Sequence, residues 1–307
     1  MQVGASRPQF LANPKFELRT PKFETNPKSK SGNDQNPRVT LRLGSLELPR
    51  WAKVAKRLEH VRTKLRPQVP PPDARMKAVI LAGGLGTRLR PFTETIPKPL
   101  LPIGEKAVLE IQINRLKRHG FDEVFLATNH MAEYLERFVG DGSQYGVRLA
   151  LSREAKPLGT VGPLTLLKDK LIEPFLVMNG DILSLVDFSD LYRFALEKAA
   201  WLTIVVRQHI TPYAFGDIFF EGDRVTGIEE KPNIIKHILA GIYIVRPEIF
   251  QLIPKDTYFG MDMLIKEMLR RDLPVVKYES HEYWLDIGQP GDYQKAQEDA
   301  REGRFAA

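Results

Sequence analysis

Three glycines and an arginine follow the first strongly apolar segment of the chain. Residues 78–82 are all apolar, and the chain continues Gly-Gly-Leu-Gly-Thr-Arg at positions 83–88. Glycine lets backbone N–H groups approach an anion closely, and the Arg88 guanidinium offers forked donors to phosphate oxygens. The dinucleotide pattern fails because Leu89 takes the place of its third glycine, and no Gly-Lys-Ser/Thr completes a P-loop. The pattern therefore predicts a phosphate-binding loop of neither common type, against the alternative of a structural strand-to-helix turn.

Two further cationic positions can serve anionic substrates. Lys98 lies between Pro97 and Pro99, which restrict its backbone, so its ammonium is suited to neutralising phosphate charge. The pair Glu230-Lys231 ends a predicted strand and offers a carboxylate for sugar hydroxyls and an ammonium for a phosphate. Taken alone, each has a structural explanation, an exposed loop lysine in one case and a surface ion pair in the other.

Two aspartates are candidates for a metal site. Asn179-Gly180-Asp181 directly follows an apolar segment, the position at which α/β enzymes hold Mg²⁺ against phosphates. Asp286 is the one acidic residue in a second apolar segment, and a buried carboxylate needs a partner. A Mg²⁺ ion shared with Asp181 would supply that partner, whereas tight-turn chemistry and a structural salt bridge are the alternatives.

The apolar periodicity predicts alternating strands and helices from Met76 onward. We expect strands at 77–82, 123–127, 147–151, 175–178 and 202–207, and helices at 106–119, 131–139, 160–168 and 188–199. This order predicts an α/β fold with a doubly wound, mostly parallel Rossmann-like sheet. Ligands of such sheets bind at the carboxyl ends of the strands.

The second half of the chain is richer in strands. We expect a hairpin from 216–220 and 224–229, strands at 240–245, 275–278 and 283–287, and helices at 247–253, 261–270 and from 290 onward. We expect this half to form a smaller, strand-rich lobe over the active-site edge of the sheet.

The charge is unevenly distributed along the 307 residues. Residues 1–75 contain 16 Lys and Arg against 6 Asp and Glu, and residues 76–307 contain 29 against 32. We expect residues 1–75 to be a basic extension, partly disordered, with one amphipathic helix at 51–65; a true start at Met76 is the alternative. Residues 76–307 form the expected catalytic domain, for which the charge gives no reason to expect nucleic-acid binding.

The composition excludes two further classes of site. The chain has no Cys, which excludes disulfides and thiolate zinc sites. It contains no apolar run of the ~18–20 residues that cross a bilayer, and no secretory signal pattern. We therefore expect a cytoplasmic protein without a membrane span.

The motifs occur together in a recognisable series. LAGGLGTRLRP, IPKPLLP, PLGT, NGD, EEKP, AGIY and WLDIG follow in this order between residues 76 and 294. The series resembles that of the sugar-nucleotide pyrophosphorylases, nucleotidyltransferases that act on sugar 1-phosphates. KPLGTVGPL at 156–164 and DIGQP at 286–290 look most similar to the mannose-1-phosphate guanylyltransferase branch.

The resemblance implies a role for each matching position. It implies a catalytic role for Arg88, Lys98 and Asp181, and Mg²⁺ as a cofactor on Asp181 and Asp286. The nucleotide would be held by Leu81, Ala82, Gly83, Gly84, Gly86, Thr87, Arg88, Lys98, Gln112, Pro157, Gly159 and Thr160. The sugar 1-phosphate would be held by Asn179, Gly216, Glu230, Lys231 and Gly241.

The implied reaction is transfer of a nucleotidyl group from an NTP to a sugar 1-phosphate, giving an NDP-sugar and pyrophosphate. GTP and mannose 1-phosphate are the expected substrates, and a homo-oligomer is the expected assembly. A UTP- or dTTP-dependent glucose-1-phosphate pyrophosphorylase remains an alternative, since Leu239 and Met263 depart from the family pattern near the sugar. A glycosyltransferase is disfavoured because no second carboxylate follows Asp181. A non-catalytic subunit is disfavoured because the charged residues of the site are all present.

Overall fold

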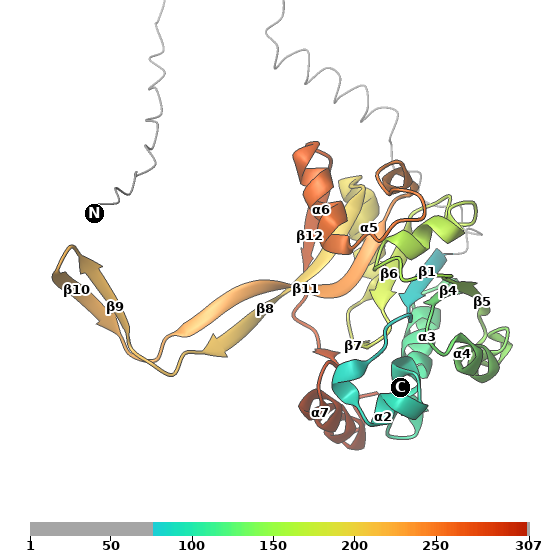
Figure 1. Cartoon of the computed structure of the whole chain (residues 1–307), viewed down its shortest axis with the longest axis horizontal. Helices are drawn as coiled ribbons and strands as arrows, with labels where there is room; N and C mark the ends of the chain where they lie inside the picture. Colours follow the sequence, from blue (N-terminus) through green and yellow to red (C-terminus); the bar gives the residue numbers. More distant parts are fainter. Residues whose placement is uncertain (1–75, 306–307) are drawn as a thin grey trace, which may run out of the picture. The chain divides into compact units, whose positions relative to one another are not determined.

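The computed structural model describes residues 76–305, and its centre is a seven-stranded sheet (Figure 1). The expected extension and helix within residues 1–75 lie outside the described residues. The strand order is β12-β8-β11-β6-β1-β4-β5. The strands are β1 (Met76–Leu81), β4 (Phe121–Thr128), β5 (Arg148–Arg153), β6 (Phe175–Asn179), β8 (Leu202–Pro212), β11 (Asn233–Val245) and β12 (Val275–Glu279).

The sheet is mostly parallel, as the sequence predicts. β1 pairs in parallel with β4 and with β6, β4 with β5, and β8 with β12. β11 is antiparallel to both of its neighbours, β6 and β8, so it alone runs against the other strands. The carboxyl ends of β6, β1, β4 and β5 therefore meet along one edge.

Both faces of the sheet are covered, which explains why the strands are apolar throughout. Successive side chains of β1 alternate between the faces, with Ala78 and Ile80 in one core and Val79 in the other. The first core includes apolar residues of α3 (Val108–Arg118), α4 (Ala132–Val139) and α5 (Phe188–Lys198). The second includes those of α6 (Met261–Arg270) and of the 3₁₀ helices η4 (Gly162–Leu167) and η5 (Pro247–Gln251).

Two of the expected helices are corrected in type. The segments at 160–168 and 247–253 form 3₁₀ turns, for example with the Leu164 N–H donating to the Val161 carbonyl at 3.0 Å. Each has a proline in its first turn, and short turns with i→i+3 bonds suit such segments. The other short 3₁₀ turns are η1 (Thr87–Leu89), η2 (Lys98–Leu100) and η3 (Ser143–Tyr145), and one further short helix, α2, spans Phe92–Thr95.

A small two-stranded ladder joins two distant parts of the chain. β7 (Ile182–Ser184) pairs antiparallel with β13 (Trp284–Asp286), and Asp286 lies opposite Ile182. The C-terminal helix α7 (Pro290–Arg301) follows, and a short ladder joins β2 (Pro102–Ile103) to β3 (Lys106–Ala107). The β7–β13 ladder thus brings residue 286 to the turn that follows β6.

The strand-rich part of the second half is arranged differently from the expected lobe. β8 and β11 continue past the sheet as a two-stranded stem that leads to the predicted hairpin of β9 (Asp217–Glu221) and β10 (Arg224–Glu229). Figure 1 shows the stem and hairpin extending away from the sheet. Over residues 76–305, no helix has the length and hydropathy needed to cross a membrane.

Candidate active site

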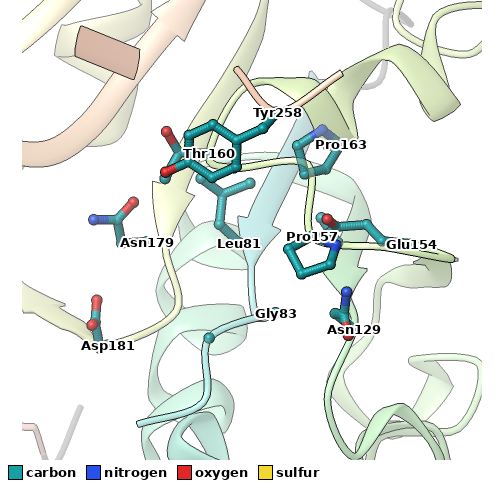
Figure 2. Close-up of a pocket in the computed structure, with 13 residues that line it drawn as sticks. Leu81, Gly83, Asn129, Glu154, Pro157, Thr160, Pro163, Asn179, Asp181 and Tyr258 are labelled. Carbon is teal, nitrogen blue, oxygen red and sulfur yellow. The ribbon is translucent and has the colours of Figure 1, made fainter. Parts of the chain in front are cut away.

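Residues that follow four neighbouring parallel strands line one cavity of about 310 Å³ (Figure 2). Gly83 and Gly84 follow β1, Asn129 follows β4, Glu154 follows β5 and Asp181 follows β6. The sheet topology brings them together, since the carboxyl ends of parallel strands share an edge. We call this cavity the base cavity.

The rest of the base cavity has mainly apolar walls. Leu81, Pro157, Pro163 and Tyr258 line it, together with Gly159 and Thr160. The Thr160 hydroxyl accepts a hydrogen bond from the backbone N–H of Met261 at 2.8 Å, which ties this wall to α6. An apolar slot with a few polar groups suits a flat heterocyclic base.

A second cavity of about 280 Å³ adjoins the first. It shares Gly84 and Asp181 with the base cavity. Its other lining residues come from the glycine loop and from two separate segments, and they are Gly86, Thr87, Arg88, Leu89, Lys98, Asp286 and Gly288. We call it the phosphate cavity.

The glycine loop has a conformation that requires glycine at position 86. Gly86 has φ of 61°, and a Cβ atom there would lie 2.8 Å from Thr93 Cγ2. The Thr93 hydroxyl donates to the Gly86 carbonyl at 2.7 Å, which fixes the turn before Arg88. The Arg88 side chain is exposed and makes no ion pair within residues 76–305, so its donors are available to a ligand.

The phosphate cavity contains two acidic groups and one fixed ammonium. Lys98 Nζ lies 2.5 Å from Asp181 Oδ2. The Ile287 N–H donates to the Asp181 carbonyl at 3.0 Å, which holds β13 and its Asp286 against the turn after β6. Burial, and then the neighbouring Asp181 carboxylate, raise the pKa of Asp286 to about 6, with Lys98 and Arg88 opposing the shift.

The two carboxyl groups fit a magnesium ion. Within the described residues, one oxygen of each, Asp181 Oδ1 and Asp286 Oδ1, is buried without a hydrogen-bond partner. No cluster of three or more His, Cys, Asp or Glu side chains suited to a metal occurs between residues 76 and 305. Mg²⁺ commonly binds to one or two carboxylates and takes its other ligands from phosphates and water, which matches this pair.

Two residues expected to contact the nucleotide are buried and line neither cavity. Gln112 is buried in α3, and its amide nitrogen donates to the carbonyls of Asn179 (2.9 Å) and Ile182 (2.7 Å). It therefore holds the turn that carries Asp181. The backbone N–H of Ala82 donates to the carbonyl of Ala127 at 2.7 Å, which ties the end of β1 to β4.

The residues expected to bind the sugar phosphate fall into two separate groups. Asn179 lines the base cavity, and a Cβ on Gly241 would lie 2.7 Å from its Nδ2 atom, so these two are neighbours. Gly216, Glu230 and Lys231 lie instead at the joint between the stem and the hairpin, and all three are exposed. A Cβ on Gly216 would lie 3.1 Å from Glu230 Oε2. The structure thus brings Asn179 close to Gly241, and Gly216 close to Glu230 and Lys231, but it does not bring these two groups close to each other.

Glu154, Asn129 and Tyr258 line the base cavity but were not expected from the sequence. Glu154 Oε2 accepts the backbone N–H of Leu158 at 2.8 Å, and burial raises the pKa of its carboxyl group. Asn129 and Glu154 both follow predicted strands, so the strand-end rule that selected Asp181 selects them too. Nothing in the sequence marks Tyr258, which reaches the cavity from the loop before α6.

Several known proteins are similar in sequence to this chain. The chain is 38% identical over 226 residues to the mannose-1-phosphate guanylyltransferase catalytic subunit beta of Danio rerio, and 36% identical over 228 residues to mannose-1-phosphate guanylyltransferase 1 of Arabidopsis thaliana. Each alignment covers 71% of this chain, and 62% and 63% of the relatives, so the chain spans a little under two thirds of their length.

A solved structure and a family model agree with these relatives. HddC from Yersinia pseudotuberculosis, in complex with GMP-PN, superposes with a TM-score of 0.59 at 27% identity, covering 73% of this chain and 99% of HddC. Residues 77–303 match the family model described as "Nucleotidyl transferase", a range that contains both cavities. The resemblance read from the motifs is confirmed, and the chain belongs to the nucleotidyl transferase family.

Proposed function

We propose that this chain transfers a guanylyl group from GTP to mannose 1-phosphate in a Mg²⁺-dependent reaction, giving GDP-mannose and pyrophosphate. One observation carries the proposal: a base-sized cavity with a carboxylate in its wall adjoins a second cavity that is lined by Arg88, Lys98 and two aspartates. A nucleoside triphosphate has the same two parts in the same order.

Glu154 favours guanine among the bases. The Watson–Crick edge of guanine carries two adjacent donors, the ring N1–H and the exocyclic N2–H₂, and a carboxylate can accept both. Uracil and thymine place carbonyl acceptors on either side of one N–H, so an ionised Glu154 would repel them. The names of the two relatives and the guanine nucleotide analogue bound to HddC support the same choice.

The reaction requires positioning and charge neutralisation rather than proton removal. An oxygen of the sugar phosphate forms a bond to the α-phosphorus of GTP, and the bond from that phosphorus to the bridging α–β oxygen breaks. The electron pair leaves with pyrophosphate. The attacking oxygen is already ionised at neutral pH, so no general base is needed.

The chain's own groups match these tasks. The exposed guanidinium of Arg88 can bind the departing phosphates, and the glycine loop offers backbone donors beside it. Lys98 holds Asp181 and adds positive charge at the same cavity. Groups that stabilise developing charge in this way are each typically worth ~3–4 kcal/mol of barrier. A Mg²⁺ ion held by Asp181 and Asp286 supplies further neutralisation of phosphate charge.

A substrate screen tests the proposal. Pyrophosphate release is measured with each of four NTPs against a panel of sugar 1-phosphates, with Mg²⁺ and with EDTA. We expect release with GTP and mannose 1-phosphate, and none in EDTA. Release with UTP or dTTP and glucose 1-phosphate would replace the proposed substrates, and no release with any pair would refute the proposed activity.

A further inference from the structure

The largest exposed apolar surface of the described residues lies on the stem and hairpin. We call residues 208–239 the arm (Figure 1). Every residue of the arm is exposed or part-buried. Eleven of the 21 large apolar side chains that are exposed between residues 76 and 305 belong to it. The arm therefore concentrates apolar surface far beyond its share of the chain.

One face of the hairpin is entirely apolar. The register places Phe220 opposite Val225 and Ile218 opposite Ile228, so these four side chains share a face. Each is between 51% and 70% exposed. A two-stranded hairpin is at best marginally stable in water unless such a face is covered, so something must pack on it.

The stem adds three further apolar side chains on one face. Ile210 pairs with Ile235, and Leu239 lies four residues further along the same face of β11, beyond the polar pair of His237 and Gln208. All three are exposed. With aromatic side chains contributing 150–250 Å² each when fully buried, the arm offers on the order of 1,000 Å² of apolar surface. Monomeric proteins rarely expose a patch above about 300–600 Å².

The stem holds the hairpin away from the chain's own site. β8 and β11 form seven consecutive pairs, from Val206 with Leu239 to Pro212 with Asn233. Seven residues of paired strand span about 20 Å. Gly241 and Asn179 lie at one end of this stem, and Glu230 and Lys231 lie at the other. Pairing along the stem would have to break for one chain to bring the two ends together.

A cavity beside the phosphate cavity can receive such an arm. It has a volume of about 550 Å³, and Trp284 and Leu285 line it together with polar and charged residues. The base of the chain's own stem also lines it, through Gln208, His209, Ile210 and Ile238. It shares Arg88 and Asp286 with the phosphate cavity. Trp284 is fixed there, since its indole N–H donates to the Ala240 carbonyl at 2.7 Å.

We infer that two copies of this chain exchange arms, with the hairpin of each copy covering the cavity beside Trp284 of the other. The exchange places Glu230 and Lys231 of one copy next to Asp181 and Asp286 of its partner, so each active site is built from two chains. The use of Glu230 and Lys231 for the sugar phosphate rests on the proposed function; the packing of the apolar face does not.

A second copy is the occupant that fits these observations. The arm carries charged residues expected to serve the reaction, and a site that can use them exists on another copy of the same chain. Two exchanged arms would bury on the order of 2,000 Å² of apolar surface, within the range of stable dimers. Reciprocal exchange of an identical element also gives a closed dimer with two-fold symmetry, in which both arms are packed and neither is free to bind a third chain.

The oligomeric state tests the packing without reference to activity. Light scattering after size exclusion should give a dimer for the wild type at micromolar concentration. Ile228→Asp should dissociate it, whereas Ile172→Asp should not, because Ile172 is equally exposed (69% against 67%) but lies outside the arm. A monomeric wild type, or equal effects of the two variants, would overturn the exchange.

Mixed dimers test whether the arm serves the partner's site. Differently tagged Asp181→Asn and Lys231→Ala chains are co-expressed, and the doubly tagged dimer is purified. In an exchanged dimer one site is intact, so we expect about half of wild-type turnover, while each variant alone is nearly inactive. No recovery in the mixed dimer, or wild-type turnover of Lys231→Ala alone, would overturn the shared site. An inactive wild type would refute the proposed function, and the light-scattering result would still decide the packing.

Discussion

Changing Glu154 to Gln should reverse the preference for guanine with little effect on the fold. Glu154 Oε2 accepts the Leu158 N–H at 2.8 Å, and a glutamine can keep this bond through its amide oxygen. The group left facing the base is then an NH₂, which is a donor where guanine also presents donors. The substitution therefore replaces the free oxygen, which can accept from both guanine donors, and leaves the side chain in place.

The expected loss follows from the two bonds removed. Hydrogen bonds to charged groups contribute about 1.5–3 kcal/mol each. Glu154 is only half-buried, so we take the lower value for both bonds, about 3 kcal/mol together. Because each 1.36 kcal/mol is a factor of ten, kcat/KM for GTP should fall about 100-fold. Relative kcat/KM for UTP should rise, because the amide now matches a carbonyl acceptor.

Steady-state pyrophosphate release at saturating mannose 1-phosphate measures kcat/KM for GTP and kcat/KM for UTP. Glu136→Gln makes the same chemical change on an exposed carboxylate of α4 and should leave both unchanged. A Glu154→Gln enzyme whose kcat/KM for GTP stays within threefold of wild type would show that guanine is recognised elsewhere.

The pH dependence provides an independent check on Glu154. Burial raises the pKa of its carboxyl group above the ordinary value. As the pH falls, Glu154 therefore becomes protonated at a higher pH than an ordinary glutamate and stops accepting hydrogen bonds from guanine. KM for GTP should accordingly rise as the pH is lowered. Glu154→Gln should abolish this rise in KM. The effect on folding stability has the opposite sign. Because the pKa of Glu154 is raised in the folded state, its ionised form destabilises the fold, and Glu154→Gln should be no less stable than the wild type at neutral pH.

Three further changes have outcomes fixed by the geometry. Gly159→Ala should lower Tm by roughly 5–10 °C, because φ is 84° and the new Cβ would lie 2.8 Å from the Phe259 carbonyl oxygen. As its control, Gly84→Ala should leave Tm unchanged and raise KM for GTP, because a Cβ on Gly84 would have no neighbouring atom within 4 Å. Lys98→Gln should cut kcat by about 100-fold or more in the pyrophosphate assay, by removing a cation from the phosphate cavity. The pKa of Asp286 is raised to about 6 in the folded state, so between about pH 4 and 6 the folded chain holds a proton that the unfolded chain has lost. The free energy of unfolding in EDTA should therefore fall as the pH rises through this range. Asp286→Asn should remove this fall, unfold at a higher temperature in EDTA at pH 7.5, and lose the rise in Tm that Mg²⁺ gives the wild type.

The strands and their order are predictable because the governing pattern is local. Each parallel strand is buried on both faces, so it appears as a continuous apolar run that ends where the cavity begins. The same rule places the glycine loop and Asp181 in the site before any contact is known. Applied to every strand, it also selects Asn129 and Glu154, which follow β4 and β5.

Other features depend on contacts that the sequence pattern does not encode. Gln112 lies on the buried face of α3, and only the position of the turn after β6 shows that its amide serves two backbone carbonyls. The pairing of β7 with β13 joins residues about a hundred positions apart and sets Asp286 opposite Ile182. The turn residues between 220 and 224 predict the hairpin correctly, but they do not say what its apolar face packs against.

Two neighbouring aspartates of the phosphate cavity resist ionisation in the folded chain. Within the described residues, one oxygen of each is buried without a hydrogen-bond partner, and the pKa of Asp286 is raised first by burial and then by repulsion from the Asp181 carboxylate. Replacing either acid with a neutral residue should relieve that repulsion, so stability alone does not favour the pair. A bound cation would remove the conflict, because it would give both carboxylates a partner. Under the proposed function it would also add positive charge where the phosphates bind, so the repulsion within the pair is a consequence of building one site for cations and phosphates together.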